Sequence, residues 1–245
     1  MALKQIKTAR RMAAATPENR NRYADFLRAL AILAVVVGHW LMAAVWIDAD
    51  GTHTKNVLGL VSEVQWLTWA LQVMPIFFFV GGFSNWISYT RTKNAYGVWL
   101  RGRLRRLVTP TIPLIAIWGG LGLLGPAMGI PADLARTGSQ TALIPLWFLA
   151  VYVLQVAATP LSVSVWRRFG LRAVGYLAVG AFVTDAVRAG TTTGVGFANY
   201  LFVWGAIYLV GHGWATGVFA NARRGTVLAI GAGFVLIGMT IFGPY

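Results

Sequence analysis

The chain has 245 residues, of which 57% are hydrophobic and 11% are charged, and its net charge is +14. Apolar stretches long enough to cross a bilayer recur along it, which indicates an integral membrane protein and leaves no polar segment long enough for a separate soluble domain. The absence of cysteine excludes disulfides, thiolate metal sites and cysteine nucleophiles. The three histidines lack metal-binding spacing, so no metal site is predicted.

The hydropathy pattern predicts an all-α fold, a polytopic bundle of about seven transmembrane helices. Residues 1–22 form a basic cytoplasmic arm, and residues 23–245 form one transmembrane domain. The chain stops within or just past its last span, which suggests a bundle truncated at its C-terminus. The spans are predicted at 26–47, 66–89, 107–125, 143–165, 172–187, 197–219 and 226–244.

Two connections between these spans have distinct compositions. Residues 91–106, "RTKNAYGVWLRGRLRR", mix arginines with Trp99 and Leu100, a pattern typical of a short helix lying against lipid headgroups. Residues 125–140, "GPAMGIPADLARTGSQ", are rich in glycine and proline and predict an irregular outer loop.

The positive charges are distributed unevenly about the predicted spans. With a cytoplasmic N-terminus, 18 of the 21 Lys and Arg residues fall in inner segments. This bias follows the positive-inside rule and predicts a multi-pass protein of the cell (inner) membrane. Because topology accounts for the charge, no nucleic-acid partner is needed.

The first predicted span carries ionisable residues in an otherwise apolar sequence, "NRYADFLRALAILAVVVGHWLMAAVW". Arg28 and His39 are eleven residues apart, so on a helix they share a face and lie about 16 Å apart along its axis. Asp25 lies near the same stripe. Arg28 could be a topology anchor and His39 a packing residue that bonds a neighbouring helix. An ionisable group within a membrane favours function, and a neutral imidazole suits a general base.

Four stretches in order resemble the membrane proteins of acyltransferase family 3. They are "DFLRALAILAVVVGHW" with Arg28 and His39, "MPIFFFVGGF" (74–83), "RGRLRRLVTP" (101–110) and "PLWFLAVYVL" (145–154). The resemblance implies transfer of an acyl group to an envelope glycan, a lipid or another acceptor. The family's second motif has a serine where this chain has Gly81, so that hydroxyl is missing; close helix packing is the alternative role of Gly81 and Gly82.

The resemblance further implies direct transfer from a cytoplasmic acyl-CoA, with acetyl-CoA as the expected co-substrate and no bound cofactor. Arg103 and Arg106 would bind its phosphates, with Asp25 also assigned to substrate binding, although positive-inside topology alone explains this basic loop equally well. His39 would deprotonate the acceptor hydroxyl or amine, and Arg28 would hold the donor or stabilise charge. The expected partners are the acyl-CoA donor, a carbohydrate or lipid-linked acceptor, and membrane lipid.

Two other classes of protein remain open. A small-solute transporter also needs inward polar residues, but no inverted repeat is evident in the sequence. A non-catalytic membrane assembly partner is the second alternative. Several further polar residues within predicted spans are interpreted as hydrogen bonds between helices and are left off the site: Gln72, Asn85, Gln155, Asn199 and His212.

Overall fold

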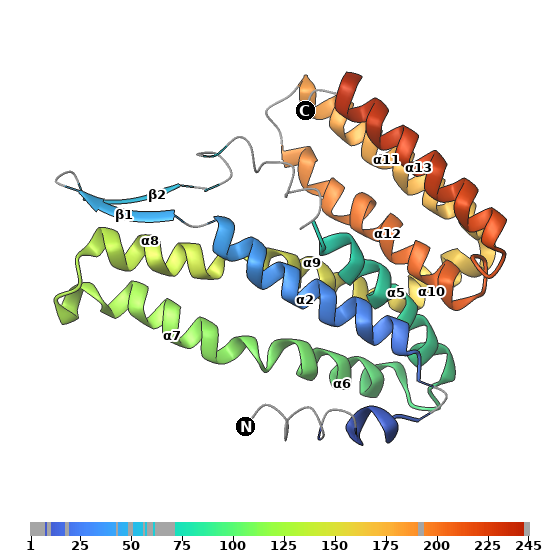
Figure 1. Ribbon diagram of the computed structural model, residues 1–245, viewed down its shortest axis with the longest axis horizontal. Coiled ribbons are helices and arrows are strands. Elements are labelled where there is room, and N and C mark those ends of the chain that lie inside the picture. Colours follow the sequence, from blue (N-terminus) through green and yellow to red (C-terminus); the bar gives the residue numbers. More distant parts are fainter. Residues whose placement is uncertain are drawn as a thin grey trace.

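The computed structural model of the chain describes residues 8, 11–17, 20–42, 44–48, 51–55, 57, 61, 72–190 and 194–242, and it is a helical bundle (Figure 1). The helical architecture was predicted. In chain order the described elements are α2 (Arg22–Met42), β1 (Ala44–Asp48), β2 (Gly51–Lys55), α5 (Met74–Arg91), α6 (Tyr96–Val108), α7 (Thr111–Leu124), η2 (Pro126–Met128), α8 (Ala132–Leu143), α9 (Leu146–Ala157), α10 (Thr159–Phe169), α11 (Leu171–Ala189), η3 (Gly194–Ala198), α12 (Asn199–Ala215) and α13 (Ala222–Phe242).

The predicted number of membrane crossings is not confirmed. Within the described residues, two helical segments are long and apolar enough to cross a membrane, Ala132–Ala157 and Gly194–Ala215. The number of candidate spans rises to four if two bent helix pairs each form one span. These pairs are α6 with α7 and α10 with α11. Seven spans are therefore not confirmed, and residues 66–71, which open the second predicted span, lie outside the described part.

Several predicted boundaries are wrong. The first span ends at Met42, and the chain then forms the antiparallel hairpin of β1 and β2, which hydropathy did not predict. The fourth span is divided between α9 and α10 at Ala158, immediately before the Thr159–Pro160 step. Proline lacks the N–H that a continuing helix needs, and it is tolerated in the first turn of a new helix.

The predicted irregular loop at 125–140 is also wrong. After the short η2, residues Ala132–Leu143 form α8, which continues into α9 as one candidate span. Pro131 precedes the helix, and Asp133 lies in its first turn, where a carboxylate interacts favourably with the helix dipole. The predicted helix in the inner loop exists as α6, which meets α7 at a bend of 46°.

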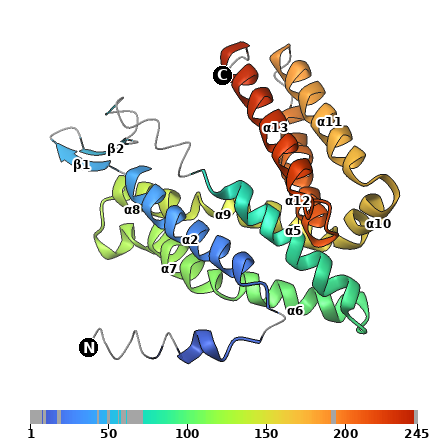
Figure 2. The same cartoon turned by 45° about the vertical axis from the view of Figure 1, so that its right-hand side comes forward.

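The centre of the bundle is the contact between α5 and α12, which is the most extensive helix pair (Figure 2). The two backbones approach so closely that a Cβ on Gly82 would lie 2.0 Å from the carbonyl oxygen of Tyr208. A Cβ on Gly211 would lie 2.1 Å from the carbonyl oxygen of Phe79. Glycine is therefore required on both helices, and the packing role suggested for Gly82 is confirmed.

The surface is rich in exposed apolar side chains. Large apolar side chains such as Ile32 and Leu33 of α2, Phe182 of α11 and Phe234 of α13 are more than half exposed. Lipid contact is the physical reason that such a surface is stable.

Arg22, in the first turn of α2, and Arg91, in the last turn of α5, lie toward one end of the bundle, whereas Arg188 lies in the last turn of α11 toward the other. The N-termini of α2, α6 and α13 and the C-terminus of α5 all lie toward the right of Figure 1, and the hairpin lies at the far left. This arrangement agrees with a positively charged face on one side of a membrane.

Candidate functional site

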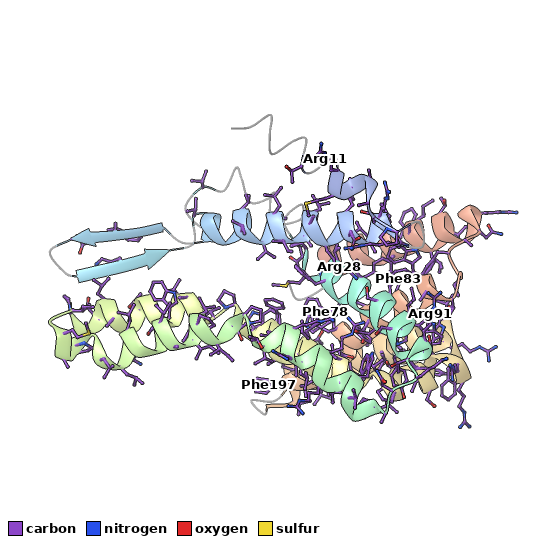
Figure 3. The ribbon with its side chains drawn as sticks, turned by 90° about the horizontal axis from the view of Figure 1, so that it is seen from below. Arg11, Arg28, Phe78, Phe83, Arg91 and Phe197 are labelled. Carbon is purple, nitrogen blue, oxygen red and sulfur yellow. The ribbon has the colours of Figure 1, made fainter. Side chains whose placement is uncertain are left out.

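Arg28 of α2 is held between α2 and α5. Its Nη1 donates to Oδ1 of Asp25 at 2.8 Å, one turn earlier on the same helix, and its Nη2 donates to Oγ of Ser84 on α5. Figure 3 shows Arg28 beside α5, close to Phe83. The side chain is half-buried, so the guanidinium is fixed at the helix contact rather than extended into solvent.

Asp25 connects this arginine to the basic arm. Its Oδ2 accepts a 2.5 Å hydrogen bond from Nε of Arg20 while its Oδ1 accepts from Arg28. The hydrogen bond from Arg20 lowers the pKa of the Asp25 carboxyl, and the charge of Arg28 lowers it further. Asp25 is therefore placed to position Arg28, and its assignment to substrate binding stays a prediction.

His39 lies on the same continuous helix as Arg28, so the predicted shared element is confirmed. Eleven residues of α-helix are three turns and about 20°, which places the two positions near one stripe about 16 Å apart. On that stripe Ala24 and Ala31 are buried, and the α2 face that carries them packs against α5. The side chain of His39 lies outside the described residues, so its role stays a prediction.

Arg103 and Arg106 of α6 occupy different environments. Arg103 is half-buried, and its guanidinium carbon lies 5.8 Å from the ring centroid of Trp99. Arg106 is exposed. The two arginines predicted to act as a pair therefore differ, because only Arg103 approaches the interior.

A buried polar cluster lies behind Arg103, and the sequence analysis missed it as a unit. Thr159 of α10 and Tyr208 of α12, both completely buried, are joined by a 2.9 Å hydrogen bond between their hydroxyls. Asn85 of α5 is buried nearby, beside the hydroxyls of Tyr152 and Tyr208. Tyrosines in apolar spans are common, so no sequence signal distinguished these two.

The missing serine of the second motif has a local explanation. A Cβ on Gly81 would lie 2.5 Å from both the Cε2 and the hydroxyl oxygen of Tyr152. The tyrosine of α9 therefore fills the space that a side chain at position 81 would occupy. The packing role suggested for Gly81 is confirmed, and the Tyr152 hydroxyl lies where the serine hydroxyl is missing.

His212 of α12 links three helices. Its Nδ1 lies 3.1 Å from the carbonyl oxygen of Gly82 on α5, and its Nε2 lies 3.0 Å from Oγ of Ser162 on α10. The ring also packs against Trp86 at a centroid distance of 5.0 Å. The predicted role as a hydrogen bond between helices is confirmed, because both ring nitrogens are used for structure.

The arrangement suits stabilisation of negative charge. Arg28 comes from α2 and Arg103 from α6, and both guanidinium groups are half-buried. Fixed cationic donors in such an environment stabilise phosphates or a developing oxyanion more effectively than they would in water. Among the described residues, no group of three His, Asp or Glu side chains could hold a metal ion.

Comparison with known proteins identifies the family. The family model described as an acyltransferase domain, that of acyltransferase family 3, matches residues 21–245. No curated protein and no solved structure matches the chain. The match covers nearly the whole sequence, so the chain belongs to acyltransferase family 3 and is an enzyme that transfers acyl groups.

Proposed function

We propose that this member of acyltransferase family 3 transfers an acyl group, acetyl in the first instance, from cytoplasmic acyl-CoA to a hydroxyl or amine of an envelope glycan, lipid or small molecule. The proposal places the enzyme in the cell (inner) membrane with a cytoplasmic N-terminus. The collection of basic residues at one end of the helices supports this orientation.

The donor enters from the basic end. Its phosphates are bound by arginines of α6, with Arg106 at the surface and Arg103 further inside. Guanidinium groups form paired hydrogen bonds with phosphate oxygens, which favours arginine over lysine in this role. The extended pantetheine arm then carries the thioester away from the phosphates and into the bundle.

His39 acts as the general base. Its ring accepts the proton of the acceptor hydroxyl while the oxygen attacks the thioester carbonyl. Collapse of the tetrahedral intermediate breaks the carbon–sulfur bond, and the proton passes to the departing thiolate, which leaves as free coenzyme A. The products are the acylated acceptor and the thiol, and His39 returns to its neutral form.

Arg28 stabilises the charge that develops during this transfer. Asp25 and Ser84 fix its guanidinium before substrate binds, so little reorganisation is needed. The hydroxyls of Tyr152 and Tyr208 and the amide of Asn85 place further polar groups in the same interior.

The single observation that carries the proposal is the fixed guanidinium of Arg28, which comes from the first motif. Asp25 and Ser84 hold it at the contact between α2 and α5. Arg103 of the basic loop is half-buried and forms no salt bridge with a carboxylate among the described residues, so its guanidinium remains available to a phosphate of the donor.

The test is transfer of labelled acetyl from acetyl-CoA in membranes that contain the chain, measured with wild type and with Arg28→Gln. Wild-type membranes should release coenzyme A and label an acceptor, and the variant should lose most of this rate at equal expression. Arg91→Gln, at an exposed position on α5, is the matched control. Equal rates for all three proteins, or no transfer by wild type, would overturn the proposal.

A further inference from the structure

A groove of about 380 Å³ lies between the start of α11 and the first turns of α13. Its volume is in the range of small-molecule binding sites. The groove lies at the end of the bundle opposite the hairpin, where α13 begins (Figure 1). Among the described residues that line it, four are apolar and one is charged: Leu171, Val218, Val227, Leu228 and Arg223.

The apolar walls of the groove are not closed by another described helix. Leu171 exposes 40% of its surface, Leu228 42% and Val227 63%. The residues of α13 from 226 to 232 are all exposed, although α13 runs beside α11 in both views (Figures 1 and 2). In a membrane protein, such apolar surface is covered by lipid chains or by a partner helix. The space between the two helices therefore has room for an apolar occupant.

The two helices that form the groove each supply an arginine. Arg223 of α13 lines the groove, and Arg172 of α11 directly follows Leu171, which also lines it. Both arginines are exposed, and neither forms a salt bridge with a carboxylate among the described residues. Their positive charges are therefore not neutralised by the described part of the protein, and the mouth of the groove attracts an anion.

An apolar groove with arginines at its mouth matches an amphiphile that has an anionic head. Guanidinium groups form paired hydrogen bonds with phosphate oxygens, while the apolar walls cover a hydrocarbon chain. Each Lys or Arg close to an anionic membrane surface strengthens binding about fivefold. A zwitterionic phospholipid carries an ammonium group beside its phosphate, and the arginines repel that group. The charge of the groove therefore favours an anionic phospholipid over a zwitterionic one.

We propose that this groove binds one anionic phospholipid. Its phosphate contacts Arg172 and Arg223, and one acyl chain lies against Leu171, Val227 and Leu228. A second copy of the chain is the less favourable occupant, because a two-fold interface on this face would bring the same arginines of both copies together. The groove shares no residue with the proposed acyl-transfer site, so this proposal does not depend on the proposed function.

The experiment measures lipid binding by native mass spectrometry. The purified chain in detergent is titrated with dioleoylphosphatidylglycerol and, separately, with dioleoylphosphatidylcholine. Wild type should bind the anionic lipid about tenfold more tightly than the zwitterionic one. The double variant Arg172→Gln/Arg223→Gln should weaken phosphatidylglycerol binding about tenfold or more, because two charges of about fivefold each are lost. The matched control Arg91→Gln/Arg101→Gln removes two exposed charges from α5 and α6, and it should leave the affinity nearly unchanged.

A second pair of variants tests the apolar part of the groove. Val227→Trp places a large side chain in the groove at a position that is 63% exposed, so it should exclude the acyl chain without disturbing a helix contact. Phosphatidylglycerol binding should again weaken about tenfold or more. Val179→Trp is the matched control, because Val179 of α11 is equally exposed at 62% and does not line the groove. Circular dichroism should show the same helix content in both variants.

Each contrary outcome overturns the lipid site. Equal affinity for the two lipids would remove the anionic preference, and equal losses in the groove variants and their controls would remove the groove. Displacement of the lipid by sn-glycerol 3-phosphate at equal concentration would identify a site for a free phosphate. A lipid-free dimer that Val227→Trp dissociates would identify a second copy as the occupant. None of these measurements uses an acyl donor, so failure of the lipid site and failure of the enzyme mechanism are distinguished.

Discussion

Replacing Gly82 by alanine tests whether the α5–α12 contact organises the site. The new Cβ would lie 2.0 Å from the carbonyl oxygen of Tyr208, although ordinary contacts begin near 3.4 Å. The helices must therefore separate by roughly 1 Å or more, which costs about 1–3 kcal/mol as overpacking. The shift also weakens the hydrogen bond between His212 and the Gly82 carbonyl, a loss of about 0.5–1.5 kcal/mol.

The opposing term is the helix propensity of alanine. Exchanging glycine for alanine within a helix gains about 0.5–1 kcal/mol, so Gly82→Ala should lower the free energy of unfolding by about 0.5–4 kcal/mol. Gly175→Ala in α11 is the matched control, because a Cβ there meets no atom within 4 Å. It should raise stability.

The assay is unfolding of the purified protein in mixed micelles by added sodium dodecyl sulfate, followed by circular dichroism. The decisive result is the sign: Gly82→Ala shifts the midpoint down and Gly175→Ala shifts it up. If both substitutions raised the midpoint, the close approach of α5 and α12 would be refuted, and with it the account of how the buried polar cluster is assembled.

Four further predictions follow from the site. His39→Gln should lower acetyl transfer about a hundredfold or more, because glutamine keeps the hydrogen bonding of the side chain but cannot cycle a proton; the rate is measured at saturating donor. Arg103→Gln should raise the KM for acetyl-CoA more than Arg106→Gln does, because Arg103 alone approaches the interior. The pKa of Asp25 is lowered by Arg20, so its stabilising contribution is complete above the unfolded pKa of about 3.9 and is lost as the pH falls further; thermal unfolding of Asp25→Asn should depend less on pH in that range. A reporter fused after Arg106 should be cytoplasmic, and one near Asp133 should be outside.

Each of these predictions has its own contradicting result. A glutamine variant at position 39 with near-normal turnover would leave that histidine a packing residue. Equal KM values for acetyl-CoA in Arg103→Gln and Arg106→Gln would indicate that both arginines serve only the orientation of the protein in the membrane. Unchanged pH dependence in the Asp25 variant would place the acid-sensitive group elsewhere, and reversed reporter signals would invert the sides assigned to donor and acceptor.

The elements that the sequence predicted well are those with a local cause. Arg28 and His39 share one helix because an apolar run of that length with few interruptions forms one, and α6 forms because its apolar and basic residues alternate with helical spacing. The failure at α8 has a local cause too: glycine and proline lie before the helix, in the turn that leads to it, while residues 132–143 themselves form helix.

The parts that could not be predicted depend on which helices meet. Asn85, Tyr152 and Tyr208 belong to α5, α9 and α12, and nothing in their local sequence says that they share one interior. The difference between Arg103 and Arg106 is of the same kind, since both lie on one amphipathic helix and only its packing decides which one faces inward.

The hydrogen bonds of His212 fix more than the spacing of three helices. The carbonyl of Gly82 can only accept, so Nδ1 carries a proton, and in the neutral ring Nε2 must then accept from the hydroxyl of Ser162. That hydroxyl also lies 3.0 Å from the carbonyl oxygen of Thr159. A serine has one proton, so it can serve either the imidazole or the carbonyl at a given moment. Rotation about the Cβ–Oγ bond of Ser162 therefore moves its proton between the imidazole of His212 and the carbonyl of Thr159. No helix has to move when this happens.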